Sequence, residues 1–560
     1  MLYLNKSITK ITKMKIFKPT LNLLLVILLS GTAFAQEIKW GSLQKSTWGS
    51  FSPNIIADDS DNLYGFFRQS GKLHLTSYSR SKFKENYDEV MPKLKVDNIS
   101  VNIEKVSVIK DHFIIIGSYF EKEKKTEKSK KSFKSNIVAF KVDKKTGKLN
   151  SNHTELFSVE VEKKSRRGDF DVYVSENNGK VLINHTSYYK KRRRTIATFK
   201  LYNNDLELEE EFTEDFKKRD EPNSIDKINN LIIDNEGSIY YLVGLSKFVS
   251  LDANKGYEKW EEKINIEKTK PGSVITRLRY AFDKEENINI FGFYREQKAG
   301  LKGVYTLKLD YLTKEVVHSE ISDFDNDFLD NLKSNRQKKR EAKGKVVNIS
   351  DFFNAIDMIP QEDGSIAISA ETRGHKVNYT ESGDMNETAL YSSMITMKVN
   401  PDGKLAWSKY IPKKQLFWQT GIGGSFGGAI TVSGSWLYIG SFKGGIKLIF
   451  SANSDKYVKH FGSVSGVKDG KLIVIFNDHK ANQSNTPKNK IKTMKSVESS
   501  RPIAKIYDIE TGSVEHKEVK NGKQKDAPLA PSVSYTTSDG SIVVFGQKGK
   551  NFKFGELSLN

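Results

Sequence analysis

One four-part pattern recurs along the sequence and constrains its fold more than any other feature. It consists of a β-rich run, a polar turn, two further β-rich runs, and a turn that leads into an outer run. The clearest copy extends from Asn230 to Ile264, with polar turns at Asp234 to Gly237 and at Asp252 to Gly256. Such turns supply left-handed backbone positions and side-chain hydrogen bonds, which tight hairpins need. The pattern therefore predicts an all-β chain of short antiparallel strands.

Nine copies of the first hairpin are present. Besides the clear copy, they lie at Asn54 to Phe67, Val106 to Tyr119, Phe170 to Ile183, Leu278 to Tyr294, Ile356 to Ala370, Ala429 to Ile439, Val464 to Phe476 and Val533 to Gly546. The copy at Ala429 to Ile439 is compressed and glycine-rich, and it fits the pattern least well. A long series of short strands with turns at even local spacing is typical of a propeller or a sandwich array.

The two ends of the chain predict that the array closes on itself. The last copy continues through Phe552 to Leu557 and stops one strand short of a four-stranded unit. The segment Glu37 to Leu43 resembles the missing outer strand, because Trp40 holds the place of Trp260 and Trp407 in complete copies. Pairing the first strand with the last removes exposed sheet edges. Because propellers usually have four to eight blades, we predict a closed β-propeller of about eight four-stranded blades, with seven as the alternative.

The N-terminus carries the signature of an export signal. A basic start at Met14 to Lys18 precedes an apolar run from Leu21 to Leu29, and Ala33 to Ala35 form a small-x-small cleavage pattern. The apolar run is shorter than the roughly 20 residues that a membrane-spanning helix needs. We therefore predict a cleaved signal peptide over residues 1–35, with Met14 as an alternative start. The mature residues 36–560 are expected to form one propeller domain, secreted or periplasmic, without a membrane span.

The chain contains no cysteine. This absence excludes disulfide scaffolds, thiolate metal sites and cysteine nucleophiles. It also excludes lipid attachment through a lipobox cysteine, so the exported product is not expected to be a lipoprotein.

The charge is strongly basic and unevenly distributed. The formal net charge is +21, and residues 1–35 hold five lysines and no acid, so +21 minus 5 leaves +16 on the mature chain. The basic runs lie at Lys122 to Lys134, Lys190 to Arg194, Arg336 to Lys345 and Lys488 to Lys495. Such runs attract polyanions, which for an exported protein means an anionic envelope surface or an acidic glycan. The alternative is that they are solvated loops between strands. Aromatic residues are not interleaved at stacking spacing within these runs, which favours solvated loops, and nucleic acid is not expected as a partner.

The first two basic runs follow second strands in consecutive copies, so we expect them on one side of the ring. The polyanion-binding residues predicted there are Lys124, Lys125, Lys130, Lys131, Lys190, Lys191, Arg192, Arg193 and Arg194.

One charged segment, at about residues 319–350, departs from the β pattern. In Asp323 to Lys343, the residues Phe324, Phe328 and Leu332 recur every four positions, with acids first and bases last. This spacing and charge order predict an amphipathic helix. It is expected to be an insertion between two blades, either as a lid on one face or as a partner-binding helix.

Catalytic and cofactor motifs are missing from the sequence. We find no nucleophile elbow, P-loop, zinc-protease or dinucleotide fingerprint, so the catalytic residues are unknown and no cofactor is expected. His185 and His479 are interpreted as strand-end or loop residues. The acids at 323, 325 and 327 imitate a calcium loop, but Phe328 stands where that loop needs Gly, so no metal site is predicted.

A candidate ligand-binding site lies at Gln415 to Gly428. Here Leu416, Phe417 and Trp418 stand next to five glycines. One interpretation is an irregular connection whose aromatic side chains plug the ring. The other is an exposed platform, formed by Phe417 and Trp418, for a sugar or a peptide.

The repeats allow a resemblance to be named. The segment Val249 to Glu261, echoed by Leu405 to Lys409, resembles the repeats of quinoprotein-type and WD40-like β-propellers. The mature chain is also similar to uncharacterised secreted propeller-like proteins of the Bacteroidetes type. The resemblance implies an architecture and no particular chemistry. The vicinal cysteine pair of working quinoproteins is missing, and Trp260 and Trp407 are interpreted as packing between blades.

Two functional classes remain open from the sequence. The favoured one is an exported non-catalytic binding or scaffold protein that presents propeller loops to a protein, a glycan or an anionic surface. The alternative is an extracytoplasmic carbohydrate-active enzyme, a lyase or a glycosidase, with its site at the mouth of the central channel.

Overall fold

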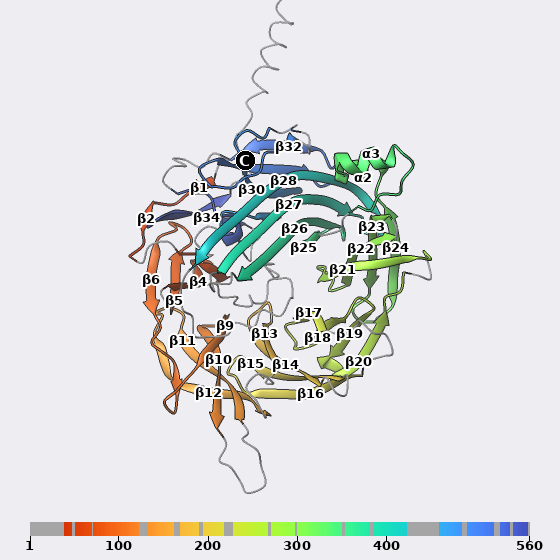
Figure 1. Ribbon diagram of the computed structural model, residues 1–560. Coiled ribbons are helices and arrows are strands. Elements are labelled where there is room, and N and C mark those ends of the chain that lie inside the picture. Colours follow the sequence, from red (N-terminus) through yellow and green to blue (C-terminus); the bar gives the residue numbers. More distant parts are fainter. Residues whose placement is uncertain are drawn as a thin grey trace, which may run out of the picture.

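The computed structural model shows eight β-sheets arranged in a ring (Figure 1). It describes residues 38–47, 51–69, 71–122, 133–161, 168–189, 194–217, 228–266, 270–296, 299–349, 353–379, 385–422, 459–483, 486, 490–519, 527–537 and 541–557. Seven sheets have four antiparallel strands, and the eighth combines the last strands of the chain with the first. The prediction of a β-propeller with eight blades is therefore confirmed. The weakest repeat, Ala429 to Ile439, lies outside the described residues.

The sheets are numbered here in chain order, with strands given from the ring axis outward. Sheet 1 contains β3 (Asn54–Asp58), β4 (Asn62–Gln69), β5 (Lys72–Ser79) and β6 (Glu85–Val90), and sheet 2 contains β9 (Asn102–Ile109), β10 (His112–Lys122), β11 (Phe133–Asp143) and β12 (Leu149–Val161). Sheet 3 contains β13 (Asp169–Val174), β14 (Lys180–Tyr189), β15 (Arg194–Asn203) and β16 (Leu208–Lys217). Sheet 4 contains β17 (Ile228–Ile233), β18 (Ile239–Val243), β19 (Lys247–Asp252) and β20 (Glu258–Lys263).

Sheet 5 contains β21 (Ser273–Phe282), β22 (Ile288–Glu296), β23 (Gly300–Leu309) and β24 (Val316–Asp323), and sheet 6 contains β25 (Phe353–Pro360), β26 (Ile366–Tyr379), β27 (Met385–Val399) and β28 (Leu405–Ile422). Sheet 7 contains β29 (Ser463–Lys468), β30 (Lys471–His479), β31 (Ser500–Asp508) and β32 (Val514–Glu518). Sheet 8 contains β33 (Tyr535–Thr536), β34 (Ile542–Lys548) and β35 (Asn551–Leu557), and both β1 (Ile38–Trp40) and β2 (Gln44–Lys45) pair with β35. A small hairpin of β7 (Lys95–Val96) and β8 (Ile99–Ser100) separates sheets 1 and 2.

The second strand of each sheet is buried on both of its faces. All five residues of β18 are buried, and so are seven consecutive residues of β30. Outer strands alternate instead, as in β20, because one of their faces meets solvent. In each repeat, the apolar runs come first and the charged run comes last, and this order therefore matches the order of the strands from the ring axis outward.

Apolar packing joins every sheet to its neighbour. Eight clusters of buried side chains each draw residues from two adjacent sheets, and one of them links sheet 8 to sheet 1. Trp407 of sheet 6 stacks on Tyr507 of sheet 7 and donates its indole N–H to the carbonyl oxygen of Ile509 at 2.8 Å. Trp260 packs against the cluster between sheets 4 and 5. The interpretation of both tryptophans as packing between blades is confirmed.

The first strand of the described chain lies beside the last one. In the antiparallel pairing of β1 with β35, Ile38 is opposite Leu557 and Trp40 is opposite Gly555. The amide of Gly41 continues this pairing by donating to the carbonyl oxygen of Phe554 at 2.9 Å. The N-terminal segment thus takes the outer position that the sequence left empty in the last repeat.

The charged insertion forms two short helices rather than one. These are α2 (Asn326–Leu332) and α3 (Asn335–Glu341), and they lie at the rim of the ring (Figure 1). The predicted apolar face is present, because Phe324, Phe328 and Leu332 are all buried. The helix is interrupted at Lys333, whose backbone is extended, and Ser334 caps a new helix by forming a capping box with Gln337. Neither helix is long or apolar enough to cross a membrane, nor is any other in the described part of the chain.

We expect the N-terminal strand to contribute measurably to stability. Ile38 exposes only 2% of its surface and packs between sheets 7 and 8, so Ile38→Ala should lower the free energy of unfolding by about 2–4 kcal/mol. Lys39→Ala, in the same strand but exposed, should change it by less than about 0.5 kcal/mol. Denaturant unfolding of both variants tests this, and equal small effects would show that β1 does not hold sheet 8.

Candidate functional site

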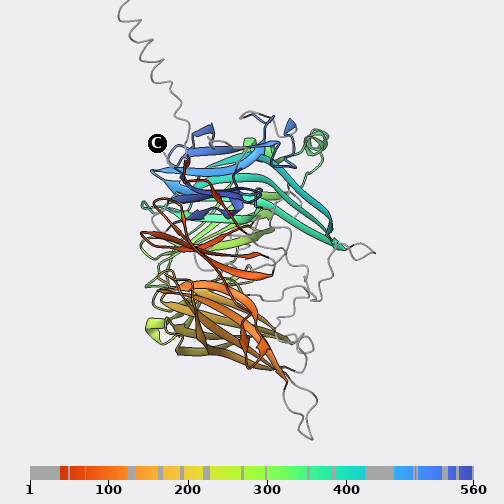
Figure 2. The ribbon, with the colours of Figure 1, turned by 90° about the vertical axis from the view of Figure 1, so that its left-hand side faces the viewer.

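The outer strands of sheet 6 extend beyond the body of the ring. The strands β26, β27 and β28 are 14, 15 and 18 residues long. Figure 2 shows them in teal, reaching past the ring on the side toward which the orange strands of sheet 2 also extend. Of the predicted segment Gln415 to Gly428, the residues up to Ile422 belong to β28, with one register shift against β27, and residues 423–428 lie outside the described part of the chain. Strand pairing with β27 fixes this segment despite its glycine-rich continuation.

One face of this extension is packed against sheet 7. Phe417 exposes 6% of its surface and shares a small apolar core with Ala389, Tyr391, Phe461 and Met494. The backbone of β28 also exchanges hydrogen bonds with the segment around Met494, through Leu416 N–H to the Met494 carbonyl at 2.9 Å and Met494 N–H to the Lys414 carbonyl at 3.0 Å. The extension is therefore held rigidly at its base.

The opposite face of the extension is open. Trp418 exposes 66% of its surface, whereas Trp40, Trp260 and Trp407 are half-buried. In the strand register, Trp418 shares this face with Leu416 and Leu390, which are half-buried. Gly374 lies opposite Leu390 and contributes no side chain to cover it. Of the two aromatic residues predicted to bind a ligand, Phe417 therefore belongs to the core and Trp418 to the surface.

The predicted polyanion-binding loops join equivalent strands in neighbouring sheets. Residues 123–132, which include Lys124, Lys125, Lys130 and Lys131, link β10 to β11, and residues 190–193 link β14 to β15. These loop residues lie outside the described part of the chain, and Arg194 is placed only as the first residue of β15. Both loops join second to third strands, as the β26–β27 connection does. The positive patch itself stays a prediction.

A buried polar cluster lies between sheets 6 and 7, nearer the ring axis. Asp357, on the innermost strand β25, accepts a hydrogen bond from Ser465 at 2.7 Å. Glu371, on β26, accepts from Arg373 at 2.7 Å and from Ser463 at 3.0 Å, and it forms an ion pair with Lys413. No sequence motif marked these residues, because they come from four different strands, β25, β26, β28 and β29.

The electrostatics of this cluster differ between its two carboxyl groups. Burial raises the pKa of Asp357, against the effects of the Ser465 hydrogen bond and the Arg373 charge. Burial would also raise the pKa of Glu371, but the charges of Lys413 and Arg373 outweigh it and hold this pKa below its ordinary value. Ionised Glu371 therefore stabilises the fold above its ordinary pKa of 4.5, and this contribution is lost as the pH falls below that value. The effect of pH on Asp357 has the opposite sign, because ionisation of this buried carboxyl group as the pH rises lowers the free energy of unfolding.

Histidines and acidic groups give no sign of a metal centre in the described residues. His185 is buried in β14 with its ring centroid 4.4 Å from that of Phe170, and His479 ends β30, where its ring nitrogen accepts from the Ala481 amide. Within the ranges that the structure describes, no three His, Asp or Glu side chains come together as metal ligands would.

Comparisons with known proteins give only distant likenesses to solved structures. No protein-family model matches the sequence, and no curated protein matches it. A solved Bacteroides caccae protein of unknown function is 9% identical, with 65% of this chain and 94% of that one covered and a TM-score of 0.25. The Dos1 propeller is 11% identical, with 82% and 93% covered and a TM-score of 0.32. The polysaccharide lyase Uly1 is 8% identical, with 93% and 100% covered and a TM-score of 0.30. At these values the likenesses carry no argument about activity.

The ion pair between Glu371 and Lys413 should be sensitive to loss of one partner. Glu371→Gln leaves Lys413 charged at 3% exposure, so we expect a loss of about 3–5 kcal/mol in the free energy of unfolding at neutral pH. The double variant Glu371→Gln/Lys413→Met should recover part of this loss, because it removes the buried charge of Lys413, although Arg373 still loses its ion pair with Glu371. Denaturant unfolding measures both. A single variant as stable as the wild type would mean that water reaches Lys413.

Proposed function

We propose that the protein is an exported, non-catalytic binding or scaffold protein of the cell envelope, which presents one face of its propeller to a partner. The observation that carries this proposal is the contrast between two adjacent residues of β28. Phe417 is packed in a core, while Trp418 exposes 66% of its surface on a rigid strand.

The exposure of Trp418 favours a role in binding. Burying a large apolar side chain stabilises a protein by about 1.5–3 kcal/mol, and the exposed Trp418 side chain contributes little of that stabilisation in the free protein. Its strand cannot turn it inward, because the side chains alternate and the inner position belongs to Phe417. Tryptophan on a pre-organised strand is a frequent anchor of binding surfaces.

The size of this surface favours a glycan chain over a protein partner. A stable protein interface buries about 800 Å² on each partner, spread over 20–30 residues. The open face described around Trp418 offers one exposed aromatic ring and the partly covered side chains of Leu390 and Leu416. A flat indole face fits the apolar face of a sugar ring, and a sugar chain needs no wide interface. The predicted basic loops would add attraction for an acidic glycan or an anionic surface.

Removing the indole tests the proposal directly. Trp418→Ala should weaken binding by about tenfold or more, measured by biolayer interferometry on immobilised neutral β-glucan and alginate. The thermal unfolding midpoint should stay nearly unchanged, because the side chain packs little. Phe417→Ala should instead lower that midpoint clearly, since its ring contacts the core formed with Phe461.

Leu312→Ala is the matched control, because Leu312 is 77% exposed in the turn between β23 and β24. It should leave both binding and stability unaltered. Equal binding by the wild type and Trp418→Ala would contradict the platform, and failure of the wild type to bind either polysaccharide would contradict the choice of a glycan.

Export predicts a defined mature N-terminus. When the full chain is produced in a Gram-negative host, the mature protein should begin at Gln36, as measured by intact mass and N-terminal sequencing of the extracytoplasmic fraction. Ala35→Trp should block processing, because signal peptidase needs a small residue there. A full-length product confined to the cytoplasm would contradict export.

One observation favours the alternative of a carbohydrate-active enzyme. Asp357 is half-buried on the innermost strand of sheet 6, and a carboxyl group with a raised pKa is suited to general acid catalysis. Release of new reducing ends or unsaturated products from the same polysaccharides, abolished by Asp357→Asn, would support the enzyme and displace the binding protein.

A further inference from the structure

The helical insertion is docked firmly onto the ring. Phe328, Leu329 and Leu332 of α2 are buried in the apolar cluster that sheets 5 and 6 share. Asp325 caps the start of α2 by accepting from the Phe328 amide. The insertion is therefore a fixed platform and not a loose loop.

Helix α3 rests on this platform with its side chains in solvent. None of its residues is buried, yet both of its ends are held. Ser334 and Gln337 form a capping box at its start, and Gln337 Nε2 donates to the carbonyl oxygen of Asn348 at 2.6 Å. The orientation of its surface is thus set without using its charged residues.

The acids of the insertion neutralise only part of its positive charge. Lys333 binds Asp330 at 2.8 Å and Glu341 at 2.6 Å, and Lys338 lies 3.8 Å from Asp330. Five further cations make no ion pair with any acid that the structure describes; they are Arg336, Lys339, Arg340, Lys343 and Lys345.

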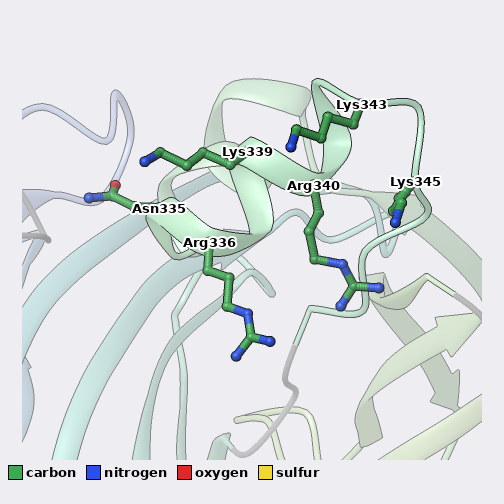
Figure 3. A pocket seen from close by; sticks show the side chains of 6 residues that line it. All are labelled: Asn335, Arg336, Lys339, Arg340, Lys343 and Lys345. Atoms are coloured by element: carbon green, nitrogen blue, oxygen red, sulfur yellow. The ribbon is translucent and has the colours of Figure 1, made fainter.

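These five cations line one open pocket. Together with Asn335 they surround a space of about 440 Å³ (Figure 3). Figure 3 shows Arg336 and Arg340, one helical turn apart, projecting to the same side of α3. Like charges at this spacing destabilise a helix by about 0.2–0.5 kcal/mol per pair, so folding alone does not favour the arrangement.

We infer that this pocket binds the sulfate or phosphate ester groups of an acidic saccharide. Two guanidinium groups on one helix face can each form two parallel hydrogen bonds to an oxyanion, and the surrounding lysines add charge without fixed geometry. The pocket lining has no aromatic side chain on which a nucleobase could stack, which favours a saccharide over single-stranded nucleic acid. This site lies on the insertion and does not depend on the surface around Trp418.

The test uses the full mature chain and a fluorescein-labelled heparin hexasaccharide, with binding followed by fluorescence anisotropy at low and at near-physiological salt. Arg336→Ala/Arg340→Ala should bind about tenfold more weakly than the wild type. Arg336→Lys/Arg340→Lys should lie between the two, because it keeps the charge and loses the paired hydrogen bonds. Binding of the wild type should weaken steeply as salt rises.

The matched control is Lys338→Ala/Lys404→Ala, which removes the same charge outside the pocket. Lys338 faces Asp330 and Lys404 faces Asp402, so this variant should lose less than about twofold. Equal losses in the control and in the arginine variant would overturn the site, because net charge alone would then explain binding. Tighter binding of a single-stranded DNA of matched charge would overturn the assignment to a saccharide.

A loop variant separates this site from the other basic runs. Replacing residues 190–193 by serine (Lys190→Ser, Lys191→Ser, Arg192→Ser, Arg193→Ser) should leave hexasaccharide binding unchanged. If this variant lost binding and the α3 variant kept it, the site on α3 would be overturned while the predicted patch on the loops would stand. Loss of glycan binding in Trp418→Ala, with hexasaccharide binding intact, would show that the two sites are independent.

Discussion

The whole structure depends on the need to cover both faces of every sheet. A four-stranded sheet with an apolar central strand buries enough surface only if a second sheet packs on each side. Each of the eight clusters therefore draws on two neighbours, and the cluster of Phe51, Phe67, Phe545 and Phe552 does so between the last sheet and the first. A ring satisfies this requirement for all eight sheets, whereas an open stack would leave two apolar faces in water.

The candidate binding surfaces lie on parts of the chain that are not needed to form the ring, namely the long strands of sheet 6 and the helical insertion. The strands of sheet 6 outgrow their neighbours, so Trp418 lies on a face that no other sheet covers. The insertion between β24 and β25 likewise commits its apolar side to the ring and leaves α3 in solvent. In both places one side is packed and the other is free, and the packed side makes the free side rigid.

The interface between sheets 6 and 7 combines apolar packing with buried charge. Glu371 and Lys413 are 2% and 3% exposed, and such a pair is costly unless both partners are present and hydrogen-bonded. Ser463 and Arg373 supply those further hydrogen bonds to Glu371. The charged groups Glu371, Arg373 and Lys413 all lie on sheet 6, and the hydrogen bonds from Ser463 to Glu371 and from Ser465 to Asp357 join this cluster to sheet 7.

The sequence by itself determined the repeat, the all-β class and the position of the first strand, because hairpin turns and alternating apolar runs are local signals that each copy carries separately. It left the number of blades at eight or seven, and the structure shows eight. It also determined which side of the insertion is buried, since Phe324, Phe328 and Leu332 have helical spacing. Only the tertiary structure separated Phe417 from Trp418, because the two are adjacent in an apolar run and their exposure depends on which face sheet 7 covers. Likewise, Asp357, Glu371 and Lys413 stand on three different strands, and the five cations around α3 become a pocket only after the chain turns back at Gly344. Local signals act within a few residues, whereas burial, charge pairing and free surface depend on contacts between segments far apart in the chain.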